Sequence, residues 1–426
     1  MEKRSNQLAA QSRREFIKTS SALGMAAWAW GAASASAAEA QPVRIGLIGC
    51  GRRGSGAVRD CIDSSPNVSV VALGDVFPDK IAECKGKLSQ LGDAYKVTDE
   101  TCFAGFDAFQ KVLQCDVNYI ILATPPAFRA AHLKAALEAG KHVFSEKPVA
   151  VDPVGIRSIL ESSELAKTKG LGIVAGTQRR HQANYLETIT RIHDGAIGDI
   201  VSAECYWIGD YSYYEPVLRQ PGWSDMEWQL RNWNYFTWLS GDHIVEQHVH
   251  NIDVMNWVLK SHPIKAMGMG GRQQRTGPEF GHIYDHFAVE FEYPNGVRVT
   301  SMCRQNAGTY HRVNEWVVGT KGTSDPAGQI NAKKKYKFEG KPANPYVQEH
   351  ADLIASIRAG KPLNEGRAIA ESTMAAIIGR LAAYTGQEVT WQWAMEESKL
   401  DLSPARLELG ELPDCAIAIP GYVNLI

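Results

Sequence analysis

The first half of the chain alternates short apolar runs with longer segments of helical patterning. Apolar, β-branched runs of strand length lie at residues 43–48, 68–73, 118–123 and 141–145. Helical patterning follows the first and the third of these runs, at residues 56–63 and 127–139. Alternation of strands with helices predicts a parallel, doubly wound sheet that is covered on both faces. Such sheets bind ligands at the carboxyl ends of their strands.

A different pattern marks the second half. Residues 286–293 alternate apolar and polar positions, a Pro-Asn-Gly turn follows at 294–296, and residues 297–304 continue as a strand. This pattern predicts an antiparallel hairpin with one buried face. Further strands are predicted at residues 171–176 and 201–208, and helices closed by glycine at 346–359 and 368–384. We therefore expect a second domain that is built on antiparallel sheet.

Length and charge narrow the class of protein. A chain of 426 residues is too long for one small core and favours two domains plus a peripheral segment. A formal net charge of −2 argues against a nucleic-acid surface, which needs a basic excess. The cysteines show no CxxC spacing, so we expect most of them to be small buried residues, with a single disulfide as the alternative.

Residues 1–40 resemble a twin-arginine export signal rather than part of the fold. Arg13 and Arg14 precede Phe16, a weakly apolar run spans residues 22–33, and small residues fill 34–38. The apolar run is too short and too rich in alanine and glycine to span a membrane well. We expect cleavage near residues 37–40 and a periplasmic or secreted protein without a membrane anchor, loaded with its cofactor in the cytoplasm. A disordered basic tail is the alternative.

A glycine-rich turn follows the first apolar run. Gly49, Gly51 and Gly54 match the GxGxxG pattern, and a helical segment comes after them. The first glycine allows a tight turn, the second lets the backbone approach a diphosphate, and the third permits close packing of strand and helix. The diphosphate then sits at the amino end of the helix. We predict a dinucleotide site, with a purely structural turn as the alternative.

Other candidate cofactor ligands stand at the predicted strand ends. Asp75 lies about twenty residues after the glycines, where a carboxylate can bind a ribose 2′-hydroxyl and repel a 2′-phosphate. NAD is therefore favoured over NADP, although Arg52 and Arg53 leave room for NADP. The predicted cofactor site also includes the ends of the third and fourth strands, at Thr124, Pro125, Glu146 and Lys147.

Several motifs together resemble those of one enzyme family. GCGRRG at 49–54, ATPP at 123–126, GKHVFSEKP at 140–148 and HVHNIDVMNW at 248–257 are similar to motifs of the glucose–fructose oxidoreductase and inositol dehydrogenase family (Gfo/Idh/MocA). The resemblance covers nearly the whole chain after residue 40. It implies an α/β protein with an N-terminal Rossmann NAD-binding domain and an α/β domain with a large open, mainly antiparallel sheet. It also implies hydride transfer between a nicotinamide cofactor and a sugar or cyclitol.

The same resemblance assigns candidate roles. The lysine of the family's EKP motif corresponds to Lys147, and the histidine of its HxxD motif corresponds to His250. Glu246 stands where many relatives have aspartate, and His248 stands where glycine is common. We place the Rossmann domain at residues 41–165, a substrate and oligomerisation domain at 166–395, and a C-terminal tail at 396–426.

The stretch 241–257 combines three histidines with acidic residues. On one continuous helix, Glu246 and His250 share a stripe, whereas His248 points away from it. The histidines therefore do not converge, and Glu246 with His250 provides too few ligands for a metal ion, so we expect no metal. We predict instead that His250 accepts the substrate proton, that Glu246 orients it or contacts substrate, and that Lys147 polarises the reacting oxygen. A structural role for His250 is the alternative.

Candidates for substrate contact lie in the second half. Aromatic residues crowd the window 206–257, which holds six of the eleven tryptophans, and such rings serve a core or a sugar site equally well. The further substrate candidates are Arg179, Arg180, His248, Tyr235, Tyr284 and His286. For the two arginines, a surface ion-pair cluster is the alternative.

Three functions remain open at this point. The first is an exported NAD(P)-dependent oxidoreductase that acts on a sugar or cyclitol hydroxyl and keeps its cofactor tightly bound, with a second sugar resetting it. The second is a redox-neutral, NAD-dependent glycosidase that works by oxidation, elimination, hydration and reduction. The third is a non-catalytic carbohydrate-binding protein, which the intact Lys147, Glu246 and His250 disfavour. An open sheet needs covering, so we expect a homodimer or homotetramer.

Overall fold

The computed structural model describes residues 41–209, 214–413 and 416–426. The predicted export signal at 1–40, Tyr211 and Tyr213 of the aromatic window, and Cys415 lie outside the described residues. The other seven cysteines are unpaired, and five of them are buried, which confirms their interpretation as small core residues. No helix in the described part of the chain is both long and apolar enough to cross a membrane.

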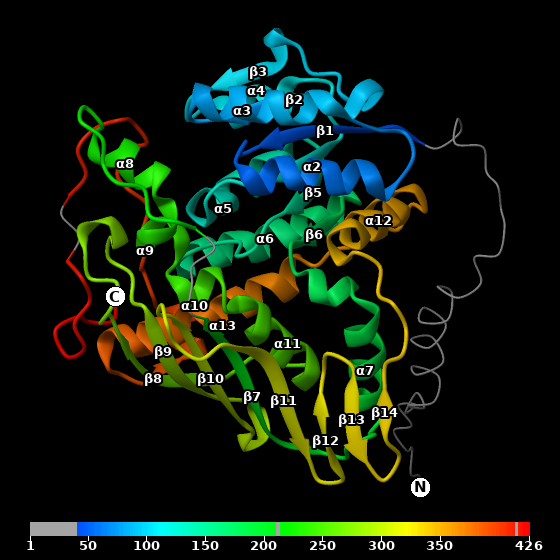
Figure 1. Ribbon diagram of the computed structural model, residues 1–426, viewed down its shortest axis with the longest axis vertical. Coiled ribbons are helices and arrows are strands. Elements are labelled where there is room, and N and C mark those ends of the chain that lie inside the picture. The colour runs from blue at the N-terminus through cyan, green and yellow to red at the C-terminus, as the bar shows by residue number, and fades with distance from the viewer. Residues whose placement is uncertain (1–40, 210–213, 414–415) are drawn as a thin grey trace, which may run out of the picture. The chain divides into compact units, whose positions relative to one another are not determined.

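The first sheet has six strands in the order β3-β2-β1-β4-β5-β6, and every neighbouring pair is parallel (Figure 1). Its strands are β1 (Val43–Ile48), β2 (Val68–Asp75), β3 (Cys102–Ala104), β4 (Tyr119–Leu122), β5 (His142–Ser145) and β6 (Ile173–Ala175). The doubly wound sheet predicted from the sequence is therefore confirmed. Because β6 belongs to this sheet, the first domain extends past the boundary that we had placed at residue 165.

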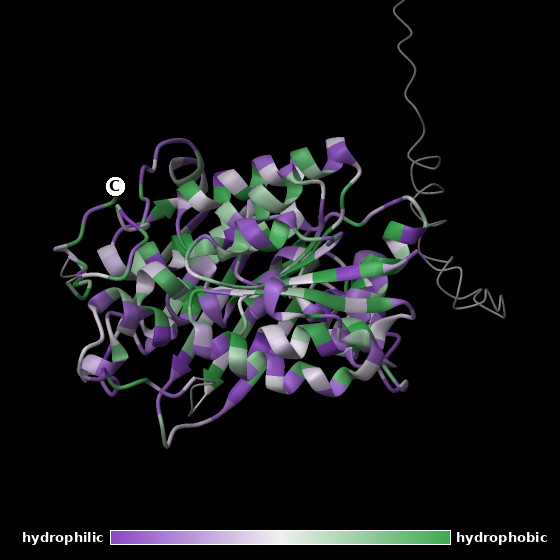
Figure 2. Ribbon diagram, turned by 90° about the horizontal axis from the view of Figure 1, so that it is seen from above, coloured by the Kyte–Doolittle hydropathy of each residue, from purple (hydrophilic) through white to green (hydrophobic). Residues whose placement is uncertain are grey.

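Helices cover both faces of the first sheet. They are α2 (Arg52–Ser64), α3 (Pro78–Leu88), α4 (Ala108–Gln114), α5 (Pro126–Glu138) and α6 (Pro153–Lys169). Successive residues of β4 serve opposite layers: Tyr119 and Ile121 join one apolar cluster, whereas Ile120 and Leu122 join the other. This two-sided burial explains why the strands are apolar throughout rather than alternating. Figure 2 shows the strands running between helices that carry both hydrophobic and hydrophilic positions.

The second sheet has nine strands in the order β14-β13-β12-β11-β7-β10-β9-β8-β15. Only the β7–β10 pair is parallel among its described pairings. The hairpin predicted from the alternating pattern is confirmed, and its residues Phe287, Val289 and Phe291 are buried. The strands are β7 (Ile200–Gly209), β8 (Lys265–Gly271), β9 (His286–Glu292), β10 (Arg298–Gln305), β11 (Arg312–Gly319), β12 (Gly322–Asp325), β13 (Gln329–Ala332), β14 (Tyr336–Lys337) and β15 (Val389–Thr390).

Two long helices connect the sheets. Helix α13 (Gly366–Thr385) is buried along almost its whole length, because it packs on β8 and β9 of the second sheet and on α6 of the first domain. Helix α12 (Pro345–Arg358) packs on α2, and its Leu353 and Ile354 complete an apolar cluster of the first domain. The remaining helices are α7 (Ala183–His193), α8 (Asp225–Arg231), α9 (Thr237–Ser240), α10 (His243–Glu246), α11 (Val249–Leu259) and α14 (Trp391–Glu396).

The prediction of one continuous helix over residues 241–257 is wrong. The structure has two helices there, α10 and α11, separated at Gln247 and His248. The His248 ring turns into the core, where its Nε2 lies 2.8 Å from Ser301 Oγ of β10. Before α10, Asp242 adopts a φ of 74°, and its carboxylate accepts a hydrogen bond from Tyr284 N at 2.8 Å. Tertiary contacts of polar side chains therefore divide a segment whose local pattern suits a single helix.

Candidate active site

The turn after β1 has the geometry that the glycine pattern predicts. Gly49 has a φ of +100°, and a Cβ there would lie 2.5 Å from the carbonyl carbon of Ala123. A Cβ on Gly54 would lie 2.0 Å from the carbonyl oxygen of Gly49. Gly51 faces open space, with no atom within 4 Å of an added Cβ. Helix α2 starts directly after it, so this turn suits a dinucleotide diphosphate at the helix terminus.

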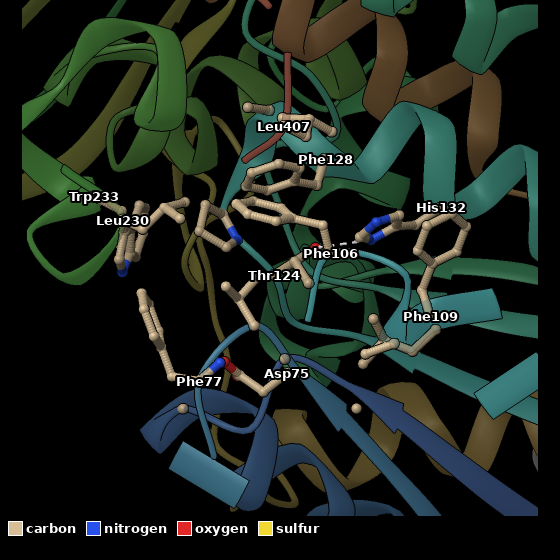
Figure 3. A pocket seen from close by; sticks show the side chains of 18 of the residues that line it. Asp75, Phe77, Phe106, Phe109, Thr124, Phe128, His132, Leu230, Trp233 and Leu407 are labelled. Carbon is tan, nitrogen blue, oxygen red and sulfur yellow. Dashed lines mark hydrogen bonds between the residues drawn. The ribbon is translucent and has the colours of Figure 1, made fainter. Parts of the chain in front are cut away.

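Asp75 stands at the end of β2, beside this turn. Its Oδ2 accepts a hydrogen bond from Cys50 N at 2.7 Å, and its Oδ1 accepts one from Phe77 N at 3.0 Å. Burial raises the pKa of Asp75, and the two backbone donors oppose that rise. The side chain borders a cavity of about 380 Å³ that Thr124 and Pro125 also line (Figure 3). An acceptor fixed at the mouth of such a cavity fits a ribose hydroxyl.

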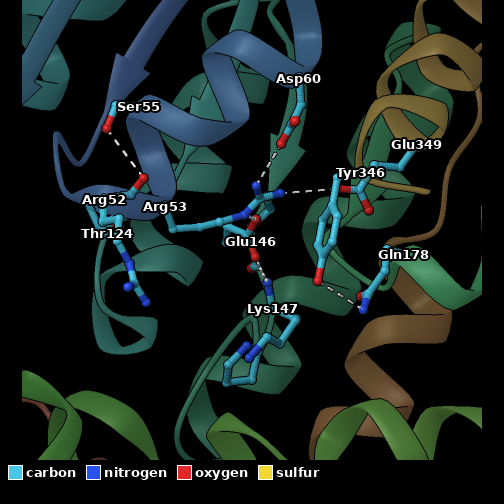
Figure 4. A network of polar contacts seen from close by, with 12 residues as sticks. Arg52, Arg53, Ser55, Asp60, Thr124, Glu146, Lys147, Gln178, Tyr346 and Glu349 are labelled. Atoms are coloured by element: carbon cyan, nitrogen blue, oxygen red, sulfur yellow. Dashed lines mark hydrogen bonds and ion pairs between the residues drawn. The ribbon is translucent and has the colours of Figure 1, made fainter. Parts of the chain in front are cut away.

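Arg53 does not line that cavity but joins a cluster of carboxylates (Figure 4). Its guanidinium hydrogen-bonds Glu146, lies 2.9 Å from Asp60 Oδ2, and reaches Glu349 Oε1 of α12 at 3.3 Å. The charges of Glu146 and Glu349 raise its pKa against the opposing effect of burial. Its positive charge is therefore matched by carboxylates of the protein.

Lys147 and Glu246 join the two domains at the carboxyl end of the first sheet. Lys147 Nζ donates to the main-chain oxygen of Glu246 at 2.5 Å and to its Oε1 at 3.0 Å. Both side chains are about nine-tenths buried, with 10% and 8% exposed. Glu246 belongs to α10, so the short helix presents a carbonyl and a carboxylate to one ammonium group. The structure thus brings together two of the three predicted catalytic residues.

His250 occupies the first turn of α11 and is buried. Burial lowers its pKa well below the usual value, and the nearby charges of Lys147 and Arg179 lower it further. The imidazole is therefore neutral at neutral pH and can accept a proton. Its ring stacks on Trp207 at 5.8 Å between centroids, and its Nδ1 has no hydrogen-bond partner among the described residues. A buried, unpaired ring nitrogen of this kind suits a site that receives a hydroxyl group.

The predicted substrate arginines have carboxylate partners. Arg179 pairs with the fully buried Glu315, and its guanidinium lies 5.8 Å from the centre of the Trp207 ring. It therefore neighbours the aromatic ring that holds His250. Arg180 instead forms a bidentate pair with Asp253, in which its Nε and Nη2 each lie 2.8 Å from a carboxylate oxygen. That pair supports the packing of α11.

Four further substrate candidates make contacts within the second domain. The His248 ring is fully buried between β7 and β10, where it contacts Cys205 and Ser301. Tyr235 Oη lies 3.2 Å from Arg275 Nη1, and Tyr284 Oη donates to Ala418 O at 2.8 Å. The ring of His286 is 41% exposed and lies 2.7 Å from Asp285 Oδ1. These contacts join the four side chains to residues other than Lys147, Glu246 and His250.

Two parts of the site were missed by the sequence interpretation. Trp207 could have been singled out only within a crowd of aromatic residues, because nothing local distinguishes it. The far wall of the cavity comes from residues 230–238 and 403–407, whose sequences carry no cofactor motif. The described residues contain no cluster of three or more His, Cys, Asp or Glu side chains arranged to hold a metal ion.

Together, these features define a class of protein. A parallel sheet that carries, at its carboxyl end, a glycine turn suited to a diphosphate, a carboxylate placed for a ribose hydroxyl and a buried lysine–carboxylate pair is the framework of an NAD-dependent oxidoreductase. Residues 43–176 match the model of the oxidoreductase family with an NAD-binding Rossmann fold, and residues 185–325 match that of the GFO/IDH/MocA C-terminal domain. The chain belongs to the Gfo/Idh/MocA family of oxidoreductases, and it is an enzyme of that type.

Individual relatives agree with this assignment. Inositol 2-dehydrogenase 3 of Saccharopolyspora erythraea is 27% identical over 333 residues, which cover 75% of this chain and 87% of the relative. A glycosyl hydrolase family 109 protein of Porphyromonas gingivalis is 25% identical over 270 residues, or 63% of this chain and 54% of that protein. The fold is shared with scyllo-inositol dehydrogenase of Lactobacillus casei, crystallised with NAD(H) and scyllo-inositol (20% identity, TM-score 0.62, 82% of this chain and 99% of that one).

Proposed function

We propose that this enzyme oxidises a secondary hydroxyl of a sugar or cyclitol by hydride transfer and keeps its NAD tightly bound. The observation that carries the proposal is the buried contact between Lys147 and Glu246 next to a neutral His250. The relatives named inositol dehydrogenase support the substrate class. The carboxylate of Asp75 at the cavity and the engagement of Arg53 by three carboxylates support NAD over NADP.

The roles of the protein's own groups follow from their placement. Gly49, Gly51 and Asp75 would hold the dinucleotide, which supplies the acceptor for the hydride that leaves the carbinol carbon. The neutral imidazole of His250 accepts the hydroxyl proton as the carbon–oxygen double bond forms. The Lys147 ammonium donates a hydrogen bond to the same oxygen while its negative charge develops, and Glu246 fixes that ammonium.

The direct test is oxidation of a panel of polyols. The purified chain that starts near residue 41 is mixed with NAD and, separately, with myo-inositol, scyllo-inositol and common aldoses, and NADH formation is followed by absorbance. Formation of NADH with at least one of these compounds supports the proposal. If no member of the panel is oxidised and no dinucleotide binds, the proposed function is wrong.

A redox-neutral glycosidase is the second candidate. The similarity to a protein named as a member of glycosyl hydrolase family 109 favours it, as does a cycle that needs no exchange of cofactor. A nitrophenyl glycoside with no added NAD separates the two functions. Release of nitrophenol without net NADH indicates the glycosidase, whereas NADH formed from a free sugar indicates the dehydrogenase.

We extend the proposal to location and assembly. The twin-arginine pattern at residues 1–40 supports export, which a mass measurement of the mature N-terminus in a periplasmic fraction tests.

The outer face of the second sheet supports a homodimer or homotetramer, because Met269, Ala288 and Met302 form a row across β8, β9 and β10. Met269 is 71% exposed and Met302 38% exposed. Light scattering on the purified protein tests this, and Met269→Lys should favour the monomer.

A further inference from the structure

The cavity beside Asp75 is closed by parts of the chain that lie outside the first domain. One wall comes from the glycine turn and the ends of β2 and β4. The opposite wall comes from Leu230, Trp233 and Trp238 of the second domain and from residues 403–407 of the C-terminal segment. Figure 3 shows Leu407 and Phe128 on the side of the cavity opposite Asp75. Three segments that are distant in sequence therefore enclose the end of the site where an adenosine would lie.

An ion pair fastens the second domain to the rim of this cavity. Arg231, the last residue of α8, contacts both carboxylate oxygens of Asp79 at 3.0 Å. Its guanidinium also lies 3.9 Å from the centre of the Phe77 ring. Phe77 and Asp79 follow Asp75 within the loop and first turn of α3. The second domain is thus attached immediately beside the predicted ribose acceptor.

The C-terminal segment is held to both domains. Leu402 N donates to Asp152 Oδ2 of the first domain at 2.9 Å. Gly410 O accepts a hydrogen bond from Met226 N at 3.0 Å, and Leu412 N donates to Asp225 Oδ2 at 3.2 Å. Residues 403–407 run between these attachments, so the part that lines the cavity is fixed at each end.

Apolar packing continues across the same three segments. One cluster contains Phe77 of the first domain together with Met226, Leu230 and Trp238 of the second. Leu402 and Leu412 of the C-terminal segment pack against it. An opening of the cavity on this side must therefore expose apolar surface as well as break the ion pair, and both cost free energy.

We propose that residues 402–407, anchored at Leu402 and again through Gly410 and Leu412, form with Arg231 and its partner Asp79 a strap that encloses the adenosine half of the bound dinucleotide and slows its exchange with solution. The inference deepens the proposed function, on which it rests, because a retained cofactor must be reset by the substrate or by a second sugar on the enzyme. Solved neighbours such as scyllo-inositol dehydrogenase cover 82% of this chain with 99% of their own length. The chain thus has segments beyond the shared fold.

The test measures the rate at which cofactor leaves. Protein is loaded with NADH, mixed with excess NAD in a stopped-flow instrument, and the loss of energy transfer from tryptophan to NADH is followed. Leu407→Ala removes a side chain that lines the cavity. Leu409→Ala removes a side chain of the same C-terminal segment that does not line the cavity. These leucines are 48% and 54% exposed, so neither substitution empties a core. Asp79→Asn weakens the ion pair from a side chain outside the cavity.

We expect Leu407→Ala to speed NADH release on the order of fivefold and Asp79→Asn on the order of threefold, because changes in affinity appear mostly in the dissociation rate. Leu409→Ala should release NADH at the rate of the unchanged protein. Equal rates in all four proteins, or equal acceleration by the two leucine substitutions, would overturn the strap. If Leu407→Ala does not fold, Asp79→Asn decides alone. If the unchanged protein does not bind NADH, the proposed function is wrong instead. The binding step shows this result before any release rates are compared.

Discussion

The ammonium group of Lys147, just after β5 of the first sheet, donates hydrogen bonds to both the main-chain oxygen and the carboxylate of Glu246, at 2.5 and 3.0 Å. Residues of two domains thus form one buried contact where the reacting groups are expected. This contact sets the position of the lysine without help from a ligand. Several predictions depend on it and on the groups that surround it.

Replacement of Lys147 by methionine removes the proposed hydrogen-bond donor to the reacting oxygen. We expect kcat to fall by about 10²–10³-fold, as is typical when one such donor is lost. Initial rates with NAD and the preferred polyol measure this. Lys141→Met is the matched control, because that lysine donates to Val117 O within the first domain. A rise in KM at unchanged kcat would mean that Lys147 only binds substrate.

His250→Gln removes the proposed proton acceptor, and we expect a fall in kcat of about 10²–10⁴-fold. The pKa of His250 is lowered by burial, so its active neutral form persists below the usual pKa of 6.5. Activity should therefore hold as pH falls to 6 and decline only at more acid pH, as the imidazole becomes charged. The profile of kcat against pH measures this, with the exposed His286→Gln as control. An acid limb unchanged in position in His250→Gln would assign that limb to another group.

Asp75→Asn removes the negative charge and keeps one of the two oxygens that accept hydrogen bonds from Cys50 N and Phe77 N. We expect the preference for NAD over NADP to fall on the order of tenfold, because the charge no longer opposes a 2′-phosphate. Dissociation constants for the two dinucleotides, measured by calorimetry, give the ratio. Glu83→Gln, an exposed charge change on α3, should leave it unaltered.

Arg53→Ala should destabilise the fold by about 3–5 kcal/mol near pH 7, because it leaves buried carboxylates without their cation. Burial and the charge of Glu146 already raise the pKa of Glu349 well above its usual value. A carboxyl whose pKa is raised on folding loses stability as pH rises, so the penalty of the variant should be smaller at pH 5 than at pH 8. Urea unfolding at both values measures this. Arg59→Ala, an exposed neighbour on α2, serves as the control.

Stability of the whole protein should fall in acid for a separate reason. Burial lowers the pKa of His132, His243 and His248 to about 3, from a usual value of 6.5. Each ring is neutral in the folded state and charged in the unfolded state below pH 6.5. Their contribution to the free energy of unfolding is therefore complete above pH 6.5 and is lost as pH falls toward 3. The loss is about 2 kcal/mol per ring by pH 5. His132→Phe should show a shallower dependence of unfolding free energy on pH.

The two sheets could be predicted because their patterns are periodic and local. Glycine spacing gave the diphosphate turn, and alternation gave the hairpin of β9 and β10. The break between α10 and α11 could not be predicted, because the contact of His248 with Ser301 joins positions that are remote in sequence. The partners of Arg53 could not be predicted for a similar reason, since Glu349 lies far along the chain. The segment 403–407 has no periodicity, so only its contacts reveal that it borders the cofactor cavity.

The packing of α12 on α2 has a mechanical consequence. The chain leaves the first domain after β6, builds the second sheet, and returns to the first before it enters α13. The two domains are therefore connected by several backbone crossings rather than by a single linker. A hinge motion that separated Lys147 from Glu246 would also have to pull α13 away from α6, because α13 packs on α6 and on the second sheet. We therefore expect substrate and cofactor to enter and leave through local movements of loops and side chains. The two domains should move together as one rigid body.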